Sequence, residues 1–298
     1  MTFREKIESN QFIVCGEIGQ PQSCDDDVIR KKSRHFKGNV NAVNITDNPS
    51  AVVKLSSIAS AKILLEEGLE PIMQMTCRDR NRLAIQSDLL GAAALGIKNV
   101  LCLTGDYQKF GDHPEAKGVF DLDSVQLIAT VANLNRGYLL SGLEMKKATD
   151  FLIGAAANPF AKPFEMRLIR LHKKIEAGAK FIQTQPVFNM DLFARWLEEA
   201  VKMGLHEKCA ILAGVMPVKS ARVLEYMKQE VPGVKIDAEY INRMKNAEDH
   251  KEEGVKIAVE TIQALKNLKG IRGIHLMPMM WESITPVLVQ EAGLNSIS

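Results

Sequence analysis

A chain of 298 residues is long enough for one large barrel or for two domains of ordinary size. It is 46% hydrophobic and 25% charged, and its net charge of +2 gives no basic tract of the kind that binds nucleic acid. No apolar run approaches the ~20 residues of a membrane-spanning helix, and the polar N-terminus lacks a signal peptide, so we expect a cytoplasmic protein without a membrane partner.

The cysteines indicate a reducing compartment. Their number is odd, and no pair has the C-x-x-C spacing of a zinc or redox site. Three of them lie in or beside apolar, strand-like runs, so we expect reduced and mostly buried thiols and no metal centre. The five are Cys15, Cys24, Cys77, Cys102 and Cys209.

Short apolar runs alternate with longer amphipathic ones along the whole chain. The short runs do not alternate with polar residues, which is typical of strands buried on both faces. Several amphipathic runs end at a glycine that precedes the next short run, as helices commonly do. In chain order the predicted elements are strands 12–15 and 42–45, helix 52–67, strand 71–75, helix 80–95, strand 99–103, helix 124–135, strand 152–156, helix 163–177, strand 181–184, helix 191–203, strand 210–215, helices 221–229 and 249–267, and strand 273–276.

Eight such units without a linker or a change of composition predict an α/β protein, a (β/α)8 TIM barrel forming a single domain over residues 1–298. An open, doubly wound sheet is the alternative. It usually has fewer strands, and no G-x-G-x-x-G turn follows the first strand here.

Active sites of such barrels lie at the C-terminal ends of the strands. Glu17 ends the first strand between apolar neighbours, where a carboxyl could act as a general acid. Asp106 follows Gly105, which permits a sharp turn, and the Gln185 amide suits the edge of a pterin or a flavin. Further polar residues at strand ends are Thr46, Asp47, Asn48, Gln74, Thr76, Arg78, Asp79, Thr104, Asn158, Gln183 and His275.

Basic residues follow the fifth strand and could meet a phosphate. They are Lys162, Arg167, Lys173 and Lys174. The chain contains no Ser-His-Asp order, no H-E-x-x-H motif and no cluster of histidine and carboxylate ligands, so hydrolase and metalloenzyme functions are poorly supported.

Motifs at successive strands resemble the methylenetetrahydrofolate reductase family. The resemblance extends over about residues 12–294. Its motifs are Gly16-Glu17, Gln74-Met75-Thr76-Cys77, Leu103-Thr104-Gly105-Asp106, Ala155-Ala156-Ala157-Asn158-Pro159, Ala177-Gly178-Ala179 leading to Gln183-Thr184-Gln185-Pro186-Val187-Phe188, and Gly214-Val215-Met216-Pro217-Val218.

The resemblance implies an FAD-containing barrel that reduces 5,10-methylenetetrahydrofolate to 5-methyltetrahydrofolate. It implies two catalytic residues: Glu17, the acid that helps to open the methylene bridge, and Asp106, which lies near the flavin pyrimidine edge and also contacts the pterin. The implied cofactor-binding residues are Thr76, Asp106, Asn158, Arg167 and Lys174, with Lys174 at the FAD phosphates. The implied substrate-binding residues are Glu17, Gln185 and Phe188.

The chain also departs from the family pattern. Ile18-Gly19-Gln20-Pro21 stands where many members have two prolines and aromatics, Thr104 stands where an arginine is frequent, and Asn158 stands where an aromatic commonly flanks the flavin. These changes surround the flavin and leave the reductant open between NAD(P)H and a partner electron-transfer protein. The sequence also leaves open homo- or hetero-oligomers.

Two other functions remain at this point. A flavin-free barrel could bind a pterin as a methyl carrier and transfer the methyl group, using the same Asp106 and Gln185. Alternatively, the chain could be a catalytic subunit that takes electrons from a partner protein. The run Leu276-Met277-Pro278-Met279-Met280-Trp281 motivates that hypothesis, because methionine-rich segments can form adaptable partner surfaces.

Overall fold

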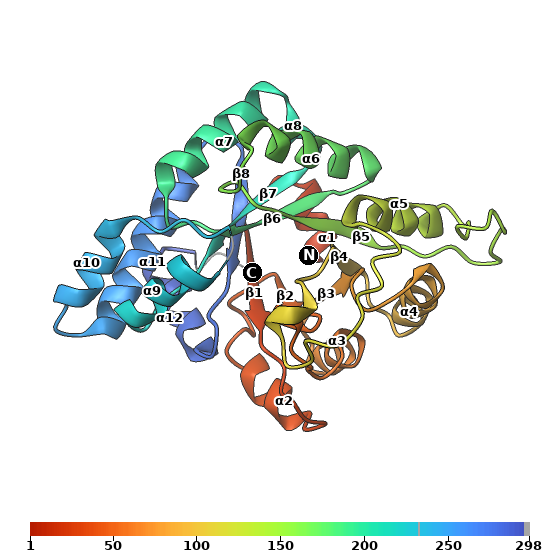
Figure 1. Cartoon of the computed structure of the whole chain (residues 1–298), viewed down its shortest axis with the longest axis horizontal. Helices are drawn as coiled ribbons and strands as arrows, with labels where there is room; N and C mark the ends of the chain where they lie inside the picture. Colours follow the sequence, from red (N-terminus) through yellow and green to blue (C-terminus); the bar gives the residue numbers. More distant parts are fainter. Residues whose placement is uncertain (232, 295–298) are drawn as a thin grey trace.

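The computed structural model describes residues 1–231 and 233–294. Within them, eight parallel strands pair in chain order and the last closes onto the first. In Figure 1 the strands surround the centre of the molecule and the helices lie outside them. The closed barrel confirms the predicted (β/α)8 fold and excludes the open sheet. Positions 232 and 295–298 of the predicted domain, residues 1–298, lie outside the described residues. The strands are β1 (Ile13–Ile18), β2 (Ala42–Ile45), β3 (Pro71–Thr76), β4 (Asn99–Leu103), β5 (Leu152–Ala157), β6 (Phe181–Pro186), β7 (Ala210–Val215) and β8 (Ile271–Leu276).

Every predicted strand and helix appears in the structure; β2, β4, β7 and α5 (Ser124–Asn135) have the predicted bounds, and the other elements shift at one or both ends. The largest shift is at residues 52–56, predicted as helix but irregular, because the Ser56 side chain caps α3 by accepting the Ala59 N–H. The predicted helices correspond to α3 (Ser57–Glu66), α4 (Arg82–Ala94), α5 (Ser124–Asn135), α6 (Phe164–Ala177), α7 (Met190–Lys202), α9 (Ala221–Glu230) and α11 (His250–Lys266). Five helices of the structure were not predicted: α1 (Phe3–Glu8), α2 (Asp27–Ser33), α8 (Leu205–Lys208), α10 (Ala238–Asn246) and α12 (Thr285–Glu291). None of the described helices is long and apolar enough to span a membrane.

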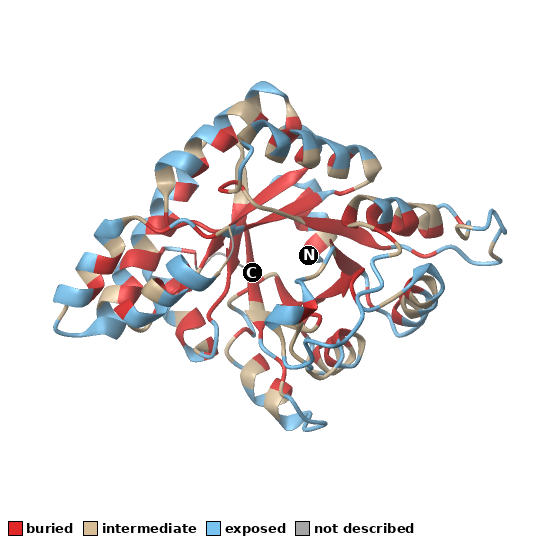
Figure 2. Cartoon of the chain, in the orientation of Figure 1, coloured by how far each residue is buried: buried red, intermediate tan, exposed pale blue. Residues whose placement is uncertain are grey.

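Two apolar clusters hold the barrel together. The outer one lies between the strands and the surrounding helices, whose outward faces are exposed in Figure 2. The inner one fills the N-terminal half of the barrel interior, where every second residue of a strand points inward. Helix α1 belongs to this inner cluster, because the Phe3 ring packs edge-on against Phe181 with centroids 5.2 Å apart. The floor of the barrel is therefore closed by apolar side chains, and polar chemistry is left to the opposite end.

Helices α9 and α10 form a third apolar cluster beside the barrel. Leu224 and Met244 lie at its centre, and a parallel bridge joins Phe188, just after β6, to Ile236. Figure 1 shows α9, α10 and α11 together on one side of the molecule. This cluster anchors the segment that follows β6.

The cysteines agree with the sequence prediction. All five are free, and four of them are buried, while Cys24 is exposed. Burial raises the pKa of the Cys15, Cys77, Cys102 and Cys209 thiols, which keeps them neutral.

Candidate active site at the barrel mouth

A layer of polar side chains lies above the apolar floor of the barrel. These residues come from separate strands and are all mostly buried. Strand pairing sets their heights, since Glu17 of β1 is level with Asn44 of β2. The layer consists of Glu17, Asn44, Gln74, Gln183 and His275. Burying polar groups costs free energy unless they are hydrogen-bonded, so a polar layer here calls for an explanation such as a bound ligand.

Glu17 lies where the polar layer meets the mouth, with 18% of its side chain exposed. Its Oε2 atom accepts a hydrogen bond from the Gln74 amide at 3.3 Å. The Nε2 atom of His275 lies 3.4 Å from the same oxygen. The predicted acid is therefore held from one side by the barrel while it stays accessible from the other.

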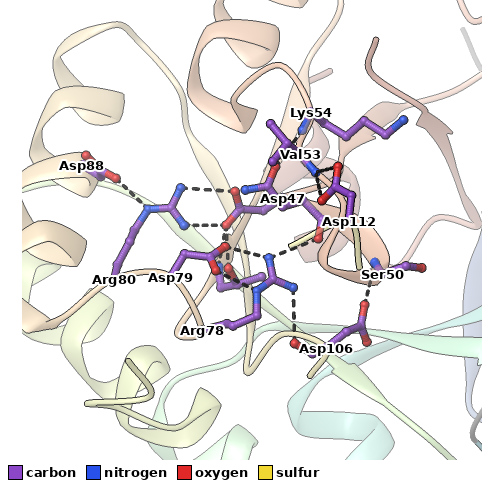
Figure 3. A network of polar contacts seen from close by, with 12 residues as sticks. Asp47, Ser50, Val53, Lys54, Arg78, Asp79, Arg80, Asp88, Asp106 and Asp112 are labelled. Atoms are coloured by element: carbon purple, nitrogen blue, oxygen red, sulfur yellow. Dashed lines mark hydrogen bonds and ion pairs between the residues drawn. The ribbon is translucent and has the colours of Figure 1, made fainter. Parts of the chain in front are cut away.

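A buried aspartate organises the ends of β2 and β3 (Figure 3). Asp47 Oδ2 accepts hydrogen bonds from the Thr76 backbone N–H and hydroxyl, both at 2.9 Å. The same carboxylate pairs with Arg80, at 2.7 Å from Nη1 to Oδ2 and 3.2 Å from Nη2 to Oδ1. Arg80 also pairs with Asp88 at 2.8 Å. Burial alone would lower the pKa of Arg80, but the two carboxylates raise it above its ordinary value.

A second arginine ties together the two loops beside Asp106 (Figure 3). Arg78 is only 2% exposed, and its guanidinium binds Asp79 through two hydrogen bonds of 2.8 and 2.6 Å. It also donates to the backbone oxygens of Asn48, at 3.1 Å, and of Asp106, at 3.4 Å. Gly105 fits beneath it with φ +96°, and a Cβ atom there would lie 2.8 Å from the Arg78 Cβ. Only glycine is accommodated at this turn.

Asp106 itself lies exposed at the mouth. Its Oδ2 accepts a hydrogen bond of 2.8 Å from the backbone N–H of Ser50, in the loop after β2. Asn48, Ser50 and Ala51 in that loop all have left-handed backbone conformations, which non-glycine residues rarely adopt. The contacts of Asp106 and Arg78 therefore hold the loop in a conformation that it would not prefer alone.

Two of the predicted phosphate-binding residues, Arg167 and Lys174, share one face of α6 with Arg170, which was not predicted; of the other two, Lys162 precedes the helix and Lys173 is exposed on it. Arg167, Arg170 and Lys174 follow one another at helical spacing, and within the described residues none of them pairs with a carboxylate. Lys174 Nζ reaches the Ala156 backbone oxygen at the end of β5, 2.5 Å away. Burial, assisted by the neighbouring Arg170 charge, lowers the pKa of Lys174 to about 8. A group of cations without counter-charges attracts an anion.

The remaining predicted residues divide between the mouth and the side cluster. Gln185 is exposed at the end of β6, and Asn158 is half-buried after β5, where its side chain accepts the Phe160 N–H at 3.0 Å. Phe188 is 2% exposed and packs edge-on against Tyr240 in the α9–α10 cluster. The structure thus gathers Glu17, Thr76, Asp106 and Gln185 at the mouth, but it does not bring the Phe188 ring there.

The sequence places Asp47, Arg78 and His275 at strand ends and Arg80 at the start of a predicted helix, but it predicts no role for any of them. The pattern Arg78-Asp79-Arg80 directly after a buried strand was an available signal, because guanidinium groups there need acidic partners from neighbouring strands. The pairing of His275 with Glu17 had no signal in the sequence, since the two residues are far apart along the chain.

Comparisons with known proteins identify the family of the chain. The family model described as methylenetetrahydrofolate reductase matches residues 2–293. The chain belongs to the methylenetetrahydrofolate reductase family. This membership confirms the resemblance drawn from the strand-end motifs.

Individual relatives are distant in sequence. The chain is 25% identical to methylenetetrahydrofolate reductase 1 of Schizosaccharomyces pombe over 236 residues, which cover 76% of this chain and 36% of the yeast protein. It is 25% identical to the 5,10-methylenetetrahydrofolate reductase of Pectobacterium carotovorum subsp. carotovorum, covering 76% of this chain and 71% of that protein. The chain thus spans about a third of the length of the yeast relative.

A solved structure has the same fold over nearly the whole chain. It is a Clostridium thermocellum protein described as binding two copies of 5-methyl-5,6,7,8-tetrahydrofolic acid. Its TM-score is 0.67 at 16% sequence identity, and the match covers 99% of both chains. At this level of identity the match shows the fold alone.

Proposed function

We propose that this member of the methylenetetrahydrofolate reductase family reduces 5,10-methylenetetrahydrofolate to 5-methyltetrahydrofolate with FAD as its cofactor. The observation that carries the proposal is the placement of Glu17. Its carboxyl lies at the mouth of the barrel with one oxygen held by Gln74, and Asp106 and Gln185 follow the ends of other strands around the same mouth. Opening the methylene bridge requires an acid at this kind of position.

The residues present fit FAD. Arg167, Arg170 and Lys174, which pair with no carboxylate among the described residues, would hold its phosphates, since they form an anion-attracting face at the end of β5. Thr76 and Asp106 would border the flavin ring, and Asn158 would lie between the ring and the phosphates. The flavin supplies hydride chemistry when bound, while the chain supplies position, charge and the proton.

The folate would lie against Glu17, Asp106 and Gln185. The exposed Gln185 amide can both donate and accept hydrogen bonds, as the pterin edge requires. The folate ligand named in the description of the Clostridium thermocellum protein supports this substrate class. Phe188 would act indirectly, because its buried ring fixes the segment after β6 against α10.

In the reaction, the protonated Glu17 gives its proton to a nitrogen of the methylene bridge. The bond between that nitrogen and the bridge carbon then breaks, and the electron pair stays on the nitrogen. A neutral amine leaves more readily than an anion, so the proton lowers the barrier. Glu17 becomes a carboxylate and must take a proton from solvent before the next turnover.

A flavin-free methyl transferase is the second candidate. It would use Asp106 and Gln185 but would have no need for the cations of α6, which therefore favour the reductase.

A partner protein as electron donor is the second possibility for the reductant. Met279 and Met280 support it, because they are 64% and 84% exposed beside the mouth strand β8.

The decisive experiment separates these functions. Protein purified from a flavin-rich host is analysed for bound FAD, reduced anaerobically with dithionite and mixed with 5,10-methylenetetrahydrofolate in a stopped-flow instrument. The reductase reoxidises its flavin and forms 5-methyltetrahydrofolate. Absence of FAD after reconstitution, or a reduced flavin that stays reduced, contradicts the proposal. NADH, NADPH and reduced ferredoxin, tried in turn, then identify the donor.

A further inference from the structure

The polar layer inside the barrel contains several buried atoms without hydrogen-bond partners among the described residues. They are Asn44 Oδ1, His275 Nε2 and both amide atoms of Gln183. Such atoms are rare in native proteins, and each calls for an explanation. His275 differs from the other two residues, because its unpartnered nitrogen lies 3.4 Å from an oxygen of Glu17. The two atoms are close enough to interact but are not aligned as a hydrogen bond.

We propose that His275 is a positioning residue for Glu17. Together with Gln74, His275 binds Oε2 of Glu17 and thereby directs the proton on Oε1 toward the substrate. This inference rests on the proposed function, in which Glu17 is the acid. Hydrogen bonds of catalytic groups are often long before the substrate binds and tighten in the complex. The separation of 3.4 Å fits such a contact.

The asymmetry of the Glu17 contacts supports this role. Both nitrogen atoms near the carboxyl, Gln74 Nε2 and His275 Nε2, approach Oε2. No hydrogen bond to Oε1 occurs within the portion of the chain that the structure describes. When the proton leaves Oε1, negative charge develops on the carboxylate. The Gln74 N–H already donates to Oε2, and a His275 N–H that tightens onto the same oxygen adds a second stabilising donor.

The surroundings of His275 leave Glu17 as its charged neighbour. Strand pairing places His275 between Cys15 of β1 and Gly214 of β7. Burial raises the pKa of the Cys15 thiol, so that thiol stays neutral, and Gly214 has no side chain. Asn44, Gln74 and Gln183, from β2, β3 and β6, are uncharged members of the layer. The proposed role requires a proton on Nε2 of His275.

Two variants of His275 test the proposal. His275→Leu has similar volume and no N–H group, whereas the amide of His275→Gln can replace the Nε2 donor. Each is purified with its flavin, reduced with dithionite and mixed with 5,10-methylenetetrahydrofolate. We expect the folate half-reaction of His275→Leu to slow about tenfold or more, because a hydrogen bond to a charged group is lost. His275→Gln should stay within about threefold of the unaltered protein.

The pH profile separates positioning from a general structural effect. Without the N–H donor the carboxylate of Glu17 is harder to form, so the decline of the folate half-reaction with rising pH should move upward by about one unit in His275→Leu. His275→Gln should keep the original profile. Unchanged FAD content, flavin spectrum and melting temperature show that His275→Leu has folded normally; if it has not, His275→Gln and His275→Met are compared in its place.

A double variant shows whether His275 acts through Glu17. If it does, adding His275→Leu to Glu17→Gln slows the folate half-reaction no further. Equal rates and profiles in His275→Leu and the unaltered protein, or fully additive effects in the double variant, would overturn the inference. The proposed function fails separately, in the unaltered protein, if its reduced flavin does not react with the folate.

Discussion

The buried carboxylate of Asp47 should be worth far more to stability than that of Asp88, although both bind the same arginine. The Asp47 side chain is 2% exposed and has four hydrogen bonds, two from Arg80 and two from Thr76. Asp47→Ala leaves the Arg80 charge poorly compensated and two Thr76 donors unpaired. Breaking such a buried pair costs about 3–5 kcal/mol. The Asp88 side chain is 37% exposed, so Asp88→Ala removes only a screened contact of about 0–1 kcal/mol.

Thermal melting of the flavin-free protein measures both variants. A loss of this size should lower the melting temperature of Asp47→Ala on the order of 10 °C, while Asp88→Ala should shift it by a few degrees at most. Asp47→Ala should also weaken FAD binding, since Thr76 and the loop after β2 lose their anchor. Equal shifts in the two variants would refute the reasoning, because they would show that burial does not distinguish the two ion pairs.

Three further variants test the proposed roles in the site. Glu17→Gln should still bind its flavin and accept electrons into it, whereas the rate of its folate half-reaction should fall by roughly two orders of magnitude or more. Stopped-flow measurement of the two half-reactions tests this. An equal loss of rate in both would show that Glu17 has a structural role. Asp106→Asn should raise the flavin midpoint potential and slow folate reduction, because a negative charge near the flavin is removed. Spectroelectrochemistry measures the potential and a steady-state assay the turnover. If both are unchanged, Asp106 does not belong to the site. The FAD dissociation constant, followed by fluorescence, should increase as pH rises from 7 to 9, because the pKa of Lys174 near 8 means that its positive charge is lost over this range. Lys174→Met should bind FAD more weakly at pH 7 and show a flatter dependence; a dependence as steep as in the unaltered protein would assign it to another group.

The alternation of short apolar and longer amphipathic runs was sufficient to predict the barrel. Strands buried on both faces and helices with one apolar face are local consequences of composition, so their order along the chain predicts a parallel, closed sheet. The strand-end rule then located Glu17, Thr76, Asp106 and Gln185 at one mouth, because all parallel strands end at the same side. The short helices α1 and α12 were missed, since their stability comes from packing on the barrel and not from a long periodic pattern.

Tertiary structure alone decided which polar residues meet. Asp47 and Arg80, and likewise Glu17 and His275, are far apart in sequence and were brought into contact by the closure and register of the sheet. Tertiary contacts also keep the Phe188 ring away from the mouth. The backbone of Phe188 pairs with Ile236, and the ring is buried in the apolar cluster of α9 and α10. A motif identifies a residue type at a strand end, but the direction and partners of its side chain depend on neighbouring strands. For that reason the sequence predicted Glu17 as a candidate acid, and only the fold revealed that Gln74 and His275 lie beside its carboxyl group.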